Sequence, residues 1–191
     1  MARVICDMSI SLDGYVTGPN DSRDNPFGDG AGMLHDWMSS MATDEDRALL
    51  QEILGGFGAV VMGRKSFEKN EGDGGWGDGG PLGDVPCFVV THNKPAASYP
   101  SVFTFVTDGV ASAIEQAKHA AGDKAVGLHG ATVMQQALPL GLVDEIRVHV
   151  IPVLLGGGTP LFRALGSPIT LERTNALATP AATHLTFRVA R

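Results

Sequence analysis

Residues 124–155, KAVGLHGATVMQQALPLGLVDEIRVHVIPVLL, contain the pattern that decides the fold class. An apolar run over 124–130 ends in a glycine turn, and ATVMQQAL (131–138) then has the apolar spacing of a helix. DEIRVHVIPVLL (144–155) follows as a long apolar strand. A strand, a helix and a second strand in this order predict an α/β fold.

The rest of the chain repeats this alternation. Thr43 is the predicted N-cap of a helix that Gly55 and Gly56 end, and Asp108 is the predicted cap of another. The predicted strands are 3–10, 59–62, 87–91, 102–106 and 183–190, and the predicted helices are 43–54 and 108–121. Strand pairs replace the alternation after about residue 140, which predicts a mixed sheet, parallel first, with antiparallel strands at the C-terminal end.

Two segments interrupt the pattern. Residues 14–32 are rich in Gly, Asp, Asn and Pro, and residues 70–86 are rich in glycine, so both predict long loops. The second loop lies inside the alternating unit and is predicted to be a mobile surface excursion, not a linker. A single domain over residues 1–191 is the natural interpretation.

Charge and composition narrow the function classes. The 191-residue chain carries a net charge of −7, which disfavours a nucleic acid or an anionic membrane as a partner. Its two cysteines, Cys6 and Cys87, lie in apolar runs and indicate a reducing compartment. The N-terminus has no signal-peptide pattern, and no apolar run reaches the roughly 20 residues of a membrane span. A cytoplasmic protein is therefore expected.

Local cations stand out in so acidic a chain, and VVMGRKSFEK (60–69) holds two of them together. Gly58–Ser66 is one residue from the phosphate-binding pattern G-x4-G-K-[ST], but its four central residues are apolar strand formers. The favoured interpretation keeps them as a strand, with Arg64 and Lys65 at its carboxyl end and Ser66 capping a helix. Such a group suits a phosphate monoester like that of NADP; two solvated surface cations are the alternative.

Three glycine-containing turns are further candidates. GLHGAT (127–132) places bare helix amides where a pyrophosphate would bind, although an ordinary tight turn explains it equally well. SISLDGYVTG (9–18) is more simply a turn. The glycines of PVLLGGGTPLF (152–162) make a turn or admit a ligand or a neighbouring subunit.

Metal and serine-nucleophile chemistry have little support. The six histidines show no H-E-x-x-H motif or paired spacing, so no metal site is predicted. There is also no G-x-S-x-G elbow.

Taken in order, these motifs resemble one family over nearly the whole chain. VVMGRKSFE resembles the strand–glycine–arginine motif of dihydrofolate reductases. The block over 127–162 is similar to the C-terminal reductase domain of the riboflavin-biosynthesis deaminase–reductase, and it is the most specific part of the match. SLDGYV, GGWGDGGP and FVVTHNKP are similar to stand-alone bacterial members of that superfamily. No zinc-deaminase motif accompanies them.

The resemblance implies a dihydrofolate-reductase-like α/β/α fold, NADPH, hydride transfer to a small heterocycle and a homodimer. Asp13 and Gly14 would shape the loop over the nicotinamide, and Arg64 with Lys65 would lie near the 2′-phosphate. The full set of implied cofactor contacts is Ser9, Val16, Gly63, Arg64, Lys65, Thr91, His92, Gly130, Ala131, Thr132 and Val133.

Two positions depart from the family pattern. His129 stands where the family usually has glycine. The helix carboxylate that supports protonation in folate enzymes corresponds best to Asp46, one residue out of register. These departures leave a binding protein without turnover as the alternative to an enzyme, and the substrate stays unnamed.

Overall fold

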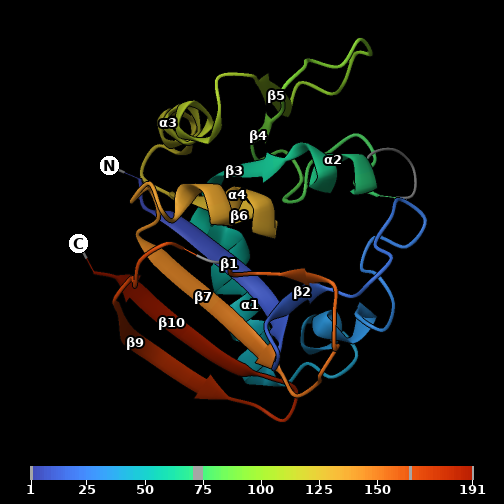
Figure 1. The fold of residues 1–191 in the computed structure, drawn as a ribbon, viewed down its shortest axis with the longest axis vertical. Coiled ribbons are helices and arrows are strands. Elements are labelled where there is room, and N and C mark those ends of the chain that lie inside the picture. The colour runs from blue at the N-terminus through green and yellow to red at the C-terminus, as the bar shows by residue number, and fades with distance from the viewer. Residues whose placement is uncertain (1, 71–74, 164, 191) are drawn as a thin grey trace.

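An eight-stranded sheet runs through the molecule (Figure 1). In this computed structural model the described residues are 2–70, 75–163 and 165–190. The strand order is β5-β4-β3-β6-β1-β7-β10-β9, in which β5 to β7 are parallel and the pairs β7–β10 and β10–β9 are antiparallel. The predicted order, parallel first and antiparallel at the C-terminal end, is confirmed.

The strands agree with the sequence prediction for most of the chain. They are β1 (Val4–Ser11), β2 (Tyr15–Thr17), β3 (Phe57–Gly63), β4 (Cys87–Val90), β5 (Phe103–Val106), β6 (Ala125–His129), β7 (Glu145–Ile151), β8 (Thr159–Pro160), β9 (Leu171–Ala178) and β10 (Thr183–Val189). One bound differs: β7 ends at Ile151 instead of 155. The 183–190 strand, whose alternation predicts an edge or closing strand, is β10 and lies between β7 and β9.

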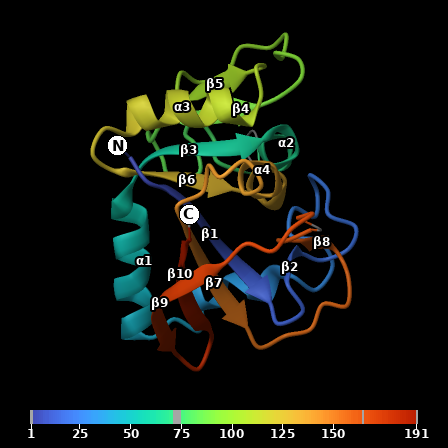
Figure 2. The ribbon, with the colours of Figure 1, turned by 60° about the vertical axis from the view of Figure 1, so that its left-hand side comes forward.

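Helices cover both faces of this sheet (Figure 2). Their bounds are η1, a 3-10 helix (Gly32–Met38), α1 (Asp44–Gly56), α2 (Arg64–Asn70), α3 (Val110–Ala121) and α4 (Ala131–Ala137). The α3 and α4 helices pack on one face, and η1, α1 and α2 pack on the other. This is a three-layer α/β/α arrangement.

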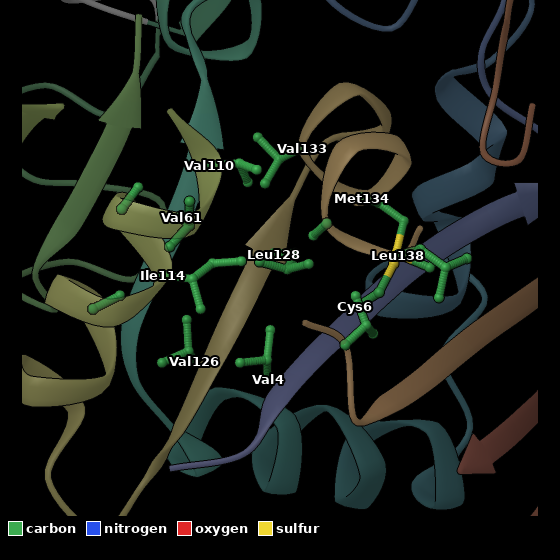
Figure 3. Close-up of a cluster of buried hydrophobic side chains, with 14 of the residues drawn as sticks. Val4, Cys6, Val61, Val110, Ile114, Val126, Leu128, Val133, Met134 and Leu138 are labelled. Atoms are coloured by element: carbon green, nitrogen blue, oxygen red, sulfur yellow. The ribbon is translucent and has the colours of Figure 1, made fainter. Parts of the chain in front are cut away.

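Alternate residues of each strand serve the two faces. Val4, Cys6, Val61, Val126 and Leu128 join the cluster under α3 and α4 (Figure 3). The intervening residues of the same strands point to the opposite layer, because successive side chains of a strand point to opposite faces. Burial on both faces explains why the parallel strands read as continuous apolar runs.

The structure corrects two predicted helix caps. Thr43 caps α1 through a capping box with Asp46, as its sequence position indicates. Asp108 does not cap α3, because the N-cap is Gly109 and makes no side-chain cap hydrogen bond. Ser66 does not begin a helix, because α2 starts at Arg64 and Ser66 lies inside it.

The structure contains strands that the sequence analysis did not predict, and it shows what one glycine of the 152–162 segment contacts. β9 is exposed along nearly its whole length, so it lacks the apolar signal by which strands were recognised. Residues 14–32 contain β2, which pairs with β8, and not only a loop. At Gly158 a Cβ would lie 1.9 Å from the Thr17 carbonyl oxygen, so glycine is needed here for the close approach of the Thr17 backbone. Part of the predicted 70–86 loop, residues 71–74, lies outside the described residues.

The phosphate-loop alternative fails on the sheet register. The residues between Gly58 and Gly63 lie in β3, hydrogen-bonded to β4 on one side and β6 on the other. A phosphate loop needs these residues in an open loop whose amides face the phosphate. Within the described ranges, no helix combines the length and the apolar character that a membrane crossing requires.

Candidate functional site

Three cavities follow one another along the edge where the parallel strands end. The first and second share Lys65, Ser66 and Thr132 in their linings. The second and third share five other residues: Met8, Val16, His35, Trp76 and His129. The carboxyl edge of an open α/β sheet is the usual place for ligands, so these cavities form the candidate site.

The first cavity, here the cationic cavity, has a volume of about 570 Å³. Among its lining residues are seven of the predicted cofactor contacts: Gly63, Arg64, Lys65, Thr91, His92, Thr132 and Val133. Lys94 adds a further cation and Glu68 the acidic group opposite them. The structure therefore brings together predicted contacts from the end of β3, the start of α2, the segment after β4 and the start of α4.

Both predicted phosphate-binding cations already have protein partners. The Arg64 Nε donates to Glu68 Oε1 at 2.7 Å, and its guanidinium lies 5.7 Å from the ring centroid of Phe67. The Lys65 Nζ donates to Asp21 at 3.1 Å, and Lys69 binds the same carboxylate. Asp21 thus ties the 18–31 loop to α2. An anion that enters the cationic cavity would meet Arg64 and Lys65, whose exposed ion pairs are weak.

The second cavity, here the middle cavity, has a volume of about 350 Å³ and contains the turn before α4. Gly130, Ala131 and Thr132 line it, and so does Val16 of β2. Gly130 has a φ of +93°, and a Cβ there would lie 2.5 Å from Ser66 Oγ. Glycine is therefore required at this position by both conformation and space.

His129 lines the middle cavity and also the third cavity, so its side chain does not turn outward. Burial lowers the pKa of His129 to about 4, with smaller contributions from His35 and Lys69. The ring is accordingly neutral at physiological pH. Its Nδ1 is buried and has no hydrogen-bond partner among the described residues.

The third cavity, here the apolar cavity, has a volume of about 300 Å³. Its wall includes the rings of Trp37, Phe57 and Trp76 and apolar residues of η1, α1 and the central strands. Ser9, another predicted contact, lines it and accepts a 2.8 Å hydrogen bond from Trp37 Nε1. Asp7 and His149 are the ionisable groups that β1 and β7 contribute to this wall.

Three predicted site residues lie elsewhere. Asp13 accepts hydrogen bonds from the amides of Leu155 and Gly156, which holds the 152–158 segment against the turn at Gly14. The hydrogen bond from Ser11 and these amides keep the pKa of Asp13 below its usual range. Asp46 is fully buried at the start of α1 and is absent from the linings of the three cavities described above.

A buried chain of four side chains was missed by the sequence analysis. Its three links are Asp7 Oδ1 to His149 Nε2 at 2.9 Å, His149 Nδ1 to His184 Nδ1 at 2.7 Å, and His184 Nε2 to Asp46 Oδ1 at 2.8 Å. We call these residues the Asp7–Asp46 chain. Asp7 inside the apolar strand 3–10 was the available signal, because a charge within a buried strand needs a partner.

Local contacts set the ionisation of the chain's inner end. Burial raises the pKa of Asp46, but hydrogen bonds from the Thr43 amide, from His184 and from the Thr43 hydroxyl outweigh it and leave the pKa below its ordinary value. Burial lowers the pKa of His184 by more than the hydrogen bond to Asp46 raises it. Asp46 is therefore ionised, and His184 is neutral.

The comparisons with known proteins agree with this architecture. The RibD C-terminal domain family matches residues 2–185. The chain belongs to the RibD C-terminal domain family. A relative, the uncharacterized protein YyaP of Bacillus subtilis (strain 168), is 25% identical over 185 residues, which cover 91% of this chain and 87% of YyaP. This family membership supports a reductase-type role.

Solved structures of the same fold cover the whole chain. A protein of Shewanella sp. PV-4, described as a riboflavin biosynthesis protein, superposes with a TM-score of 0.71 at 22% identity, covering 100% of both chains. The Thermotoga maritima deaminase/reductase gives 0.67 at 15% identity over 99% of this chain and 57% of its own. Dihydrofolate reductase from Enterococcus faecalis gives 0.56 at 12% identity, covering 99% and 97%. The predicted dihydrofolate-reductase-like fold is confirmed.

The residues of the site fit a phosphorylated dinucleotide. The cationic cavity supplies Arg64, Lys65 and Lys94 for phosphates, and a Cβ added at Gly63 would make only ordinary contacts. Along the same edge of the sheet, the middle cavity connects the cationic cavity to the apolar cavity. The apolar wall suits an aromatic ring. No group of three or more His, Cys, Asp or Glu within the part of the chain described here is arranged to hold a metal ion.

Proposed function

We propose that the protein is an NADPH-dependent reductase that transfers a hydride to a small heterocycle of the pteridine or ribosylamino-pyrimidine type. One observation carries the proposal: a cationic cavity and an apolar cavity with a carboxyl group in its wall are joined along one sheet edge. The first suits the phosphates of a cofactor, and the second suits two flat rings. NADPH would supply the hydride, while the protein supplies position and electrostatics.

Each part of the site has a role in this proposal. Arg64 and Lys65 would bind the 2′-phosphate, Thr91 and His92 would contact the adenosine end, and the turn at Gly130 would approach the pyrophosphate. Ser9 and Val16 would flank the nicotinamide, where the middle and apolar cavities meet. The 18–31 loop, held by Asp21, would cover the middle of the cofactor and exclude water.

The substrate class draws on the comparisons as well as the cavity. The Thermotoga maritima protein is named a 5-amino-6-(5-phosphoribosylamino)uracil reductase, and another structural relative is a dihydrofolate reductase. Both names denote reductases whose substrates contain a nitrogen heterocycle. An apolar cavity of about 300 Å³ with one carboxyl group suits a ring of that kind.

The test has two stages. Calorimetric titration with NADPH comes first, and no binding at millimolar concentration would contradict the proposal. Stopped-flow absorbance of NADPH then follows mixing with a panel of pterins and ribosylamino-pyrimidines. Oxidation that depends on the heterocycle supports a reductase, whereas binding without oxidation across the panel indicates the binding protein that the sequence left open.

Two further expectations belong to the same proposal. The family resemblance implies a homodimer, which light scattering of the purified protein would detect. Both cysteines are buried and unpaired, and burial raises the pKa of the Cys87 thiol to about 12, as suits a reducing cytoplasm.

A further inference from the structure

The three hydrogen bonds of the Asp7–Asp46 chain call for one hydrogen more than two neutral histidines carry. Its three links are hydrogen bonds of 2.7 to 2.9 Å, and each needs one hydrogen between its two heavy atoms. Two ionised carboxylates supply none, and two neutral imidazoles supply two. The third must be an additional proton, whichever tautomers the rings adopt. The 2.7 Å contact between the two Nδ1 atoms is decisive, because two lone pairs would repel at that distance.

The additional proton lies at the cavity end of the chain. Asp46 is ionised and accepts from Thr43 and from the Nε2 of His184. A neutral His184 that donates through Nε2 must accept at Nδ1, so His149 donates to it. The remaining proton is therefore shared between His149 Nε2 and Asp7 Oδ1.

An indole ring and an ion pair surround the place of this proton. Trp37 covers both rings, with its centroid 4.4 Å from that of His149 and 4.9 Å from that of His184. The charged groups that face the chain from β7 are Arg147, whose Nη1 lies 3.9 Å from Asp7 Oδ2, and Glu145, which binds Arg147. Cys6 of β1 packs under α3 and α4, on the opposite face of the sheet from Asp7. The titratable groups His35 and His129 line the apolar cavity together with Asp7.

The second oxygen of Asp7 has an ionic neighbour, Arg147, but makes no hydrogen bond in the described residues. This oxygen, Oδ2, is buried, although Asp7 lines the apolar cavity. An unpartnered buried carboxyl oxygen is costly unless a ligand satisfies it. The cavity that would hold the heterocycle is therefore lined by a carboxyl group whose Oδ1 shares a proton with His149 and whose Oδ2 makes no hydrogen bond within the described residues.

We infer that Asp7 is the catalytic acid that protonates the heterocycle, and that His149, His184 and Asp46 are positioning residues that keep the shared proton on it. This inference rests on the proposed function. It also gives the predicted Asp46 a part that needs no contact with the substrate, because Asp46 acts through His184.

The step balances as follows. Bound NADPH would supply the hydride, which would form a C–H bond at the carbon of a C=N group as its π bond breaks, and the ring nitrogen would then need one proton. The O–H bond of Asp7 breaks as the N–H bond forms, and the chain is then one proton short. Water restores that proton at Asp7 once the product has left the apolar cavity.

The first experiment needs neither cofactor nor substrate. Nitrogen-15 NMR of histidine-labelled protein, assigned with His149→Gln and His184→Gln, reports which ring nitrogens carry protons. We expect a proton on Nδ1 of His149 and only on Nε2 of His184 at neutral pH, and a changed Nε2 signal of His149 in Asp7→Asn. Two neutral rings with no proton on His149 Nδ1 would overturn the inference, whether or not NADPH binds.

The second experiment measures hydride transfer in single turnover with the heterocycle that the panel identifies. Asp7→Asn should lower the rate by about 10² to 10⁴-fold, the range for general acid catalysis, with NADPH affinity unchanged. Asp123→Asn, an exposed carboxylate before β6, is the matched control and should react at the wild-type rate. An Asp7→Asn protein that reacts as fast as wild type would overturn the inference.

The positioning residues need a readout that a structural role would not move. In His184→Gln and Asp46→Asn we expect the pH at which the rate is half-maximal to shift, because the shared proton is held differently. Profiles that are lower but unshifted would show structural support alone and contradict these roles. If wild type binds NADPH but reduces no heterocycle, the acid role of Asp7 falls with the proposed function, and the NMR result alone decides the shared proton.

Discussion

The cationic cavity and the Asp7–Asp46 chain both depend on charged side chains, but they are built in opposite ways. In the cavity the Lys65 side chain is 66% exposed and its pairing with Asp21 is open to solvent. In the chain the Asp46 side chain is 0% exposed, both histidines are buried, and Asp7 at the cavity end is 12% exposed. Exposed ion pairs contribute little to folding, whereas buried ones cannot lose a partner without a large penalty.

This contrast separates binding from stability. Because the cations of the cavity are weakly engaged, they can exchange their partners for an anionic ligand at small cost. The chain has no such freedom, since its members are fixed by β1, β7, β10 and α1 together. Substitutions in the cavity should therefore change ligand affinity, and substitutions in the chain should also change the free energy of unfolding.

The largest expected effect on the free energy of unfolding comes from substitution of Trp37, which is 2% exposed and covers both histidines. Trp37→Ala should lower the free energy of unfolding by about 3–5 kcal/mol in urea denaturation. Lys94→Ala, an exposed residue of the cationic cavity, should change it by less than about 0.5 kcal/mol. Similar losses for the two variants would contradict the contrast.

The next effect is a pH-dependent loss at Asp46. Asp46→Asn removes hydrogen bonds to a charged group and should lower the free energy of unfolding by about 1.5–3 kcal/mol at neutral pH. The folded-state pKa lies below the ordinary value of 3.8, so the carboxylate stabilises the fold above that pH and loses this contribution as pH falls through the folded pKa.

Denaturation curves of wild type and Asp46→Asn between pH 7 and the acid limit measure this difference. The two free energies should converge at low pH. A gap that stays constant down to acid pH would mean that the charge of Asp46 contributes nothing.

A smaller effect concerns two glycines that precede helices and line the cavities. Gly109 and Gly130 both have a φ of +93°, but only at Gly130 would a Cβ meet a neighbour, Ser66 Oγ. Each alanine substitution should lower the free energy of unfolding by about 1–3 kcal/mol because of the strained backbone conformation. Gly130→Ala should lower it more than Gly109→Ala. Adding Ser66→Ala should restore the part due to the contact, and no difference between the two glycines would contradict this explanation.

The sequence predicted the cavity better than the chain for a physical reason. Gly63, Arg64 and Lys65 are consecutive, and the strand before them ends at the sheet edge, so local pattern places them. Asp7, His149 and His184 meet only through the register in which β1 pairs with β7 and β7 with β10. No local pattern encodes that register.

The same reasoning accounts for the errors in the fold. β9 was missed because its side chains face solvent and carry no alternation. Asp108 looked like a cap from residue type alone, whereas Gly109 takes the cap position with a φ that other residues adopt at a cost. Whether Asp46 contributes to chemistry stays a prediction, since its link to the cavity runs through two histidines from distant strands.

The central claim is that the cationic cavity binds the 2′-phosphate of NADPH. Calorimetric titration of wild type and Arg64→Ala with NADPH and with NADH tests it most directly. We expect Arg64→Ala to lose about 1.5–3 kcal/mol of binding free energy for NADPH and much less for NADH, because only NADPH carries the 2′-phosphate that we propose the guanidinium binds. Equal losses for the two cofactors would contradict the assignment.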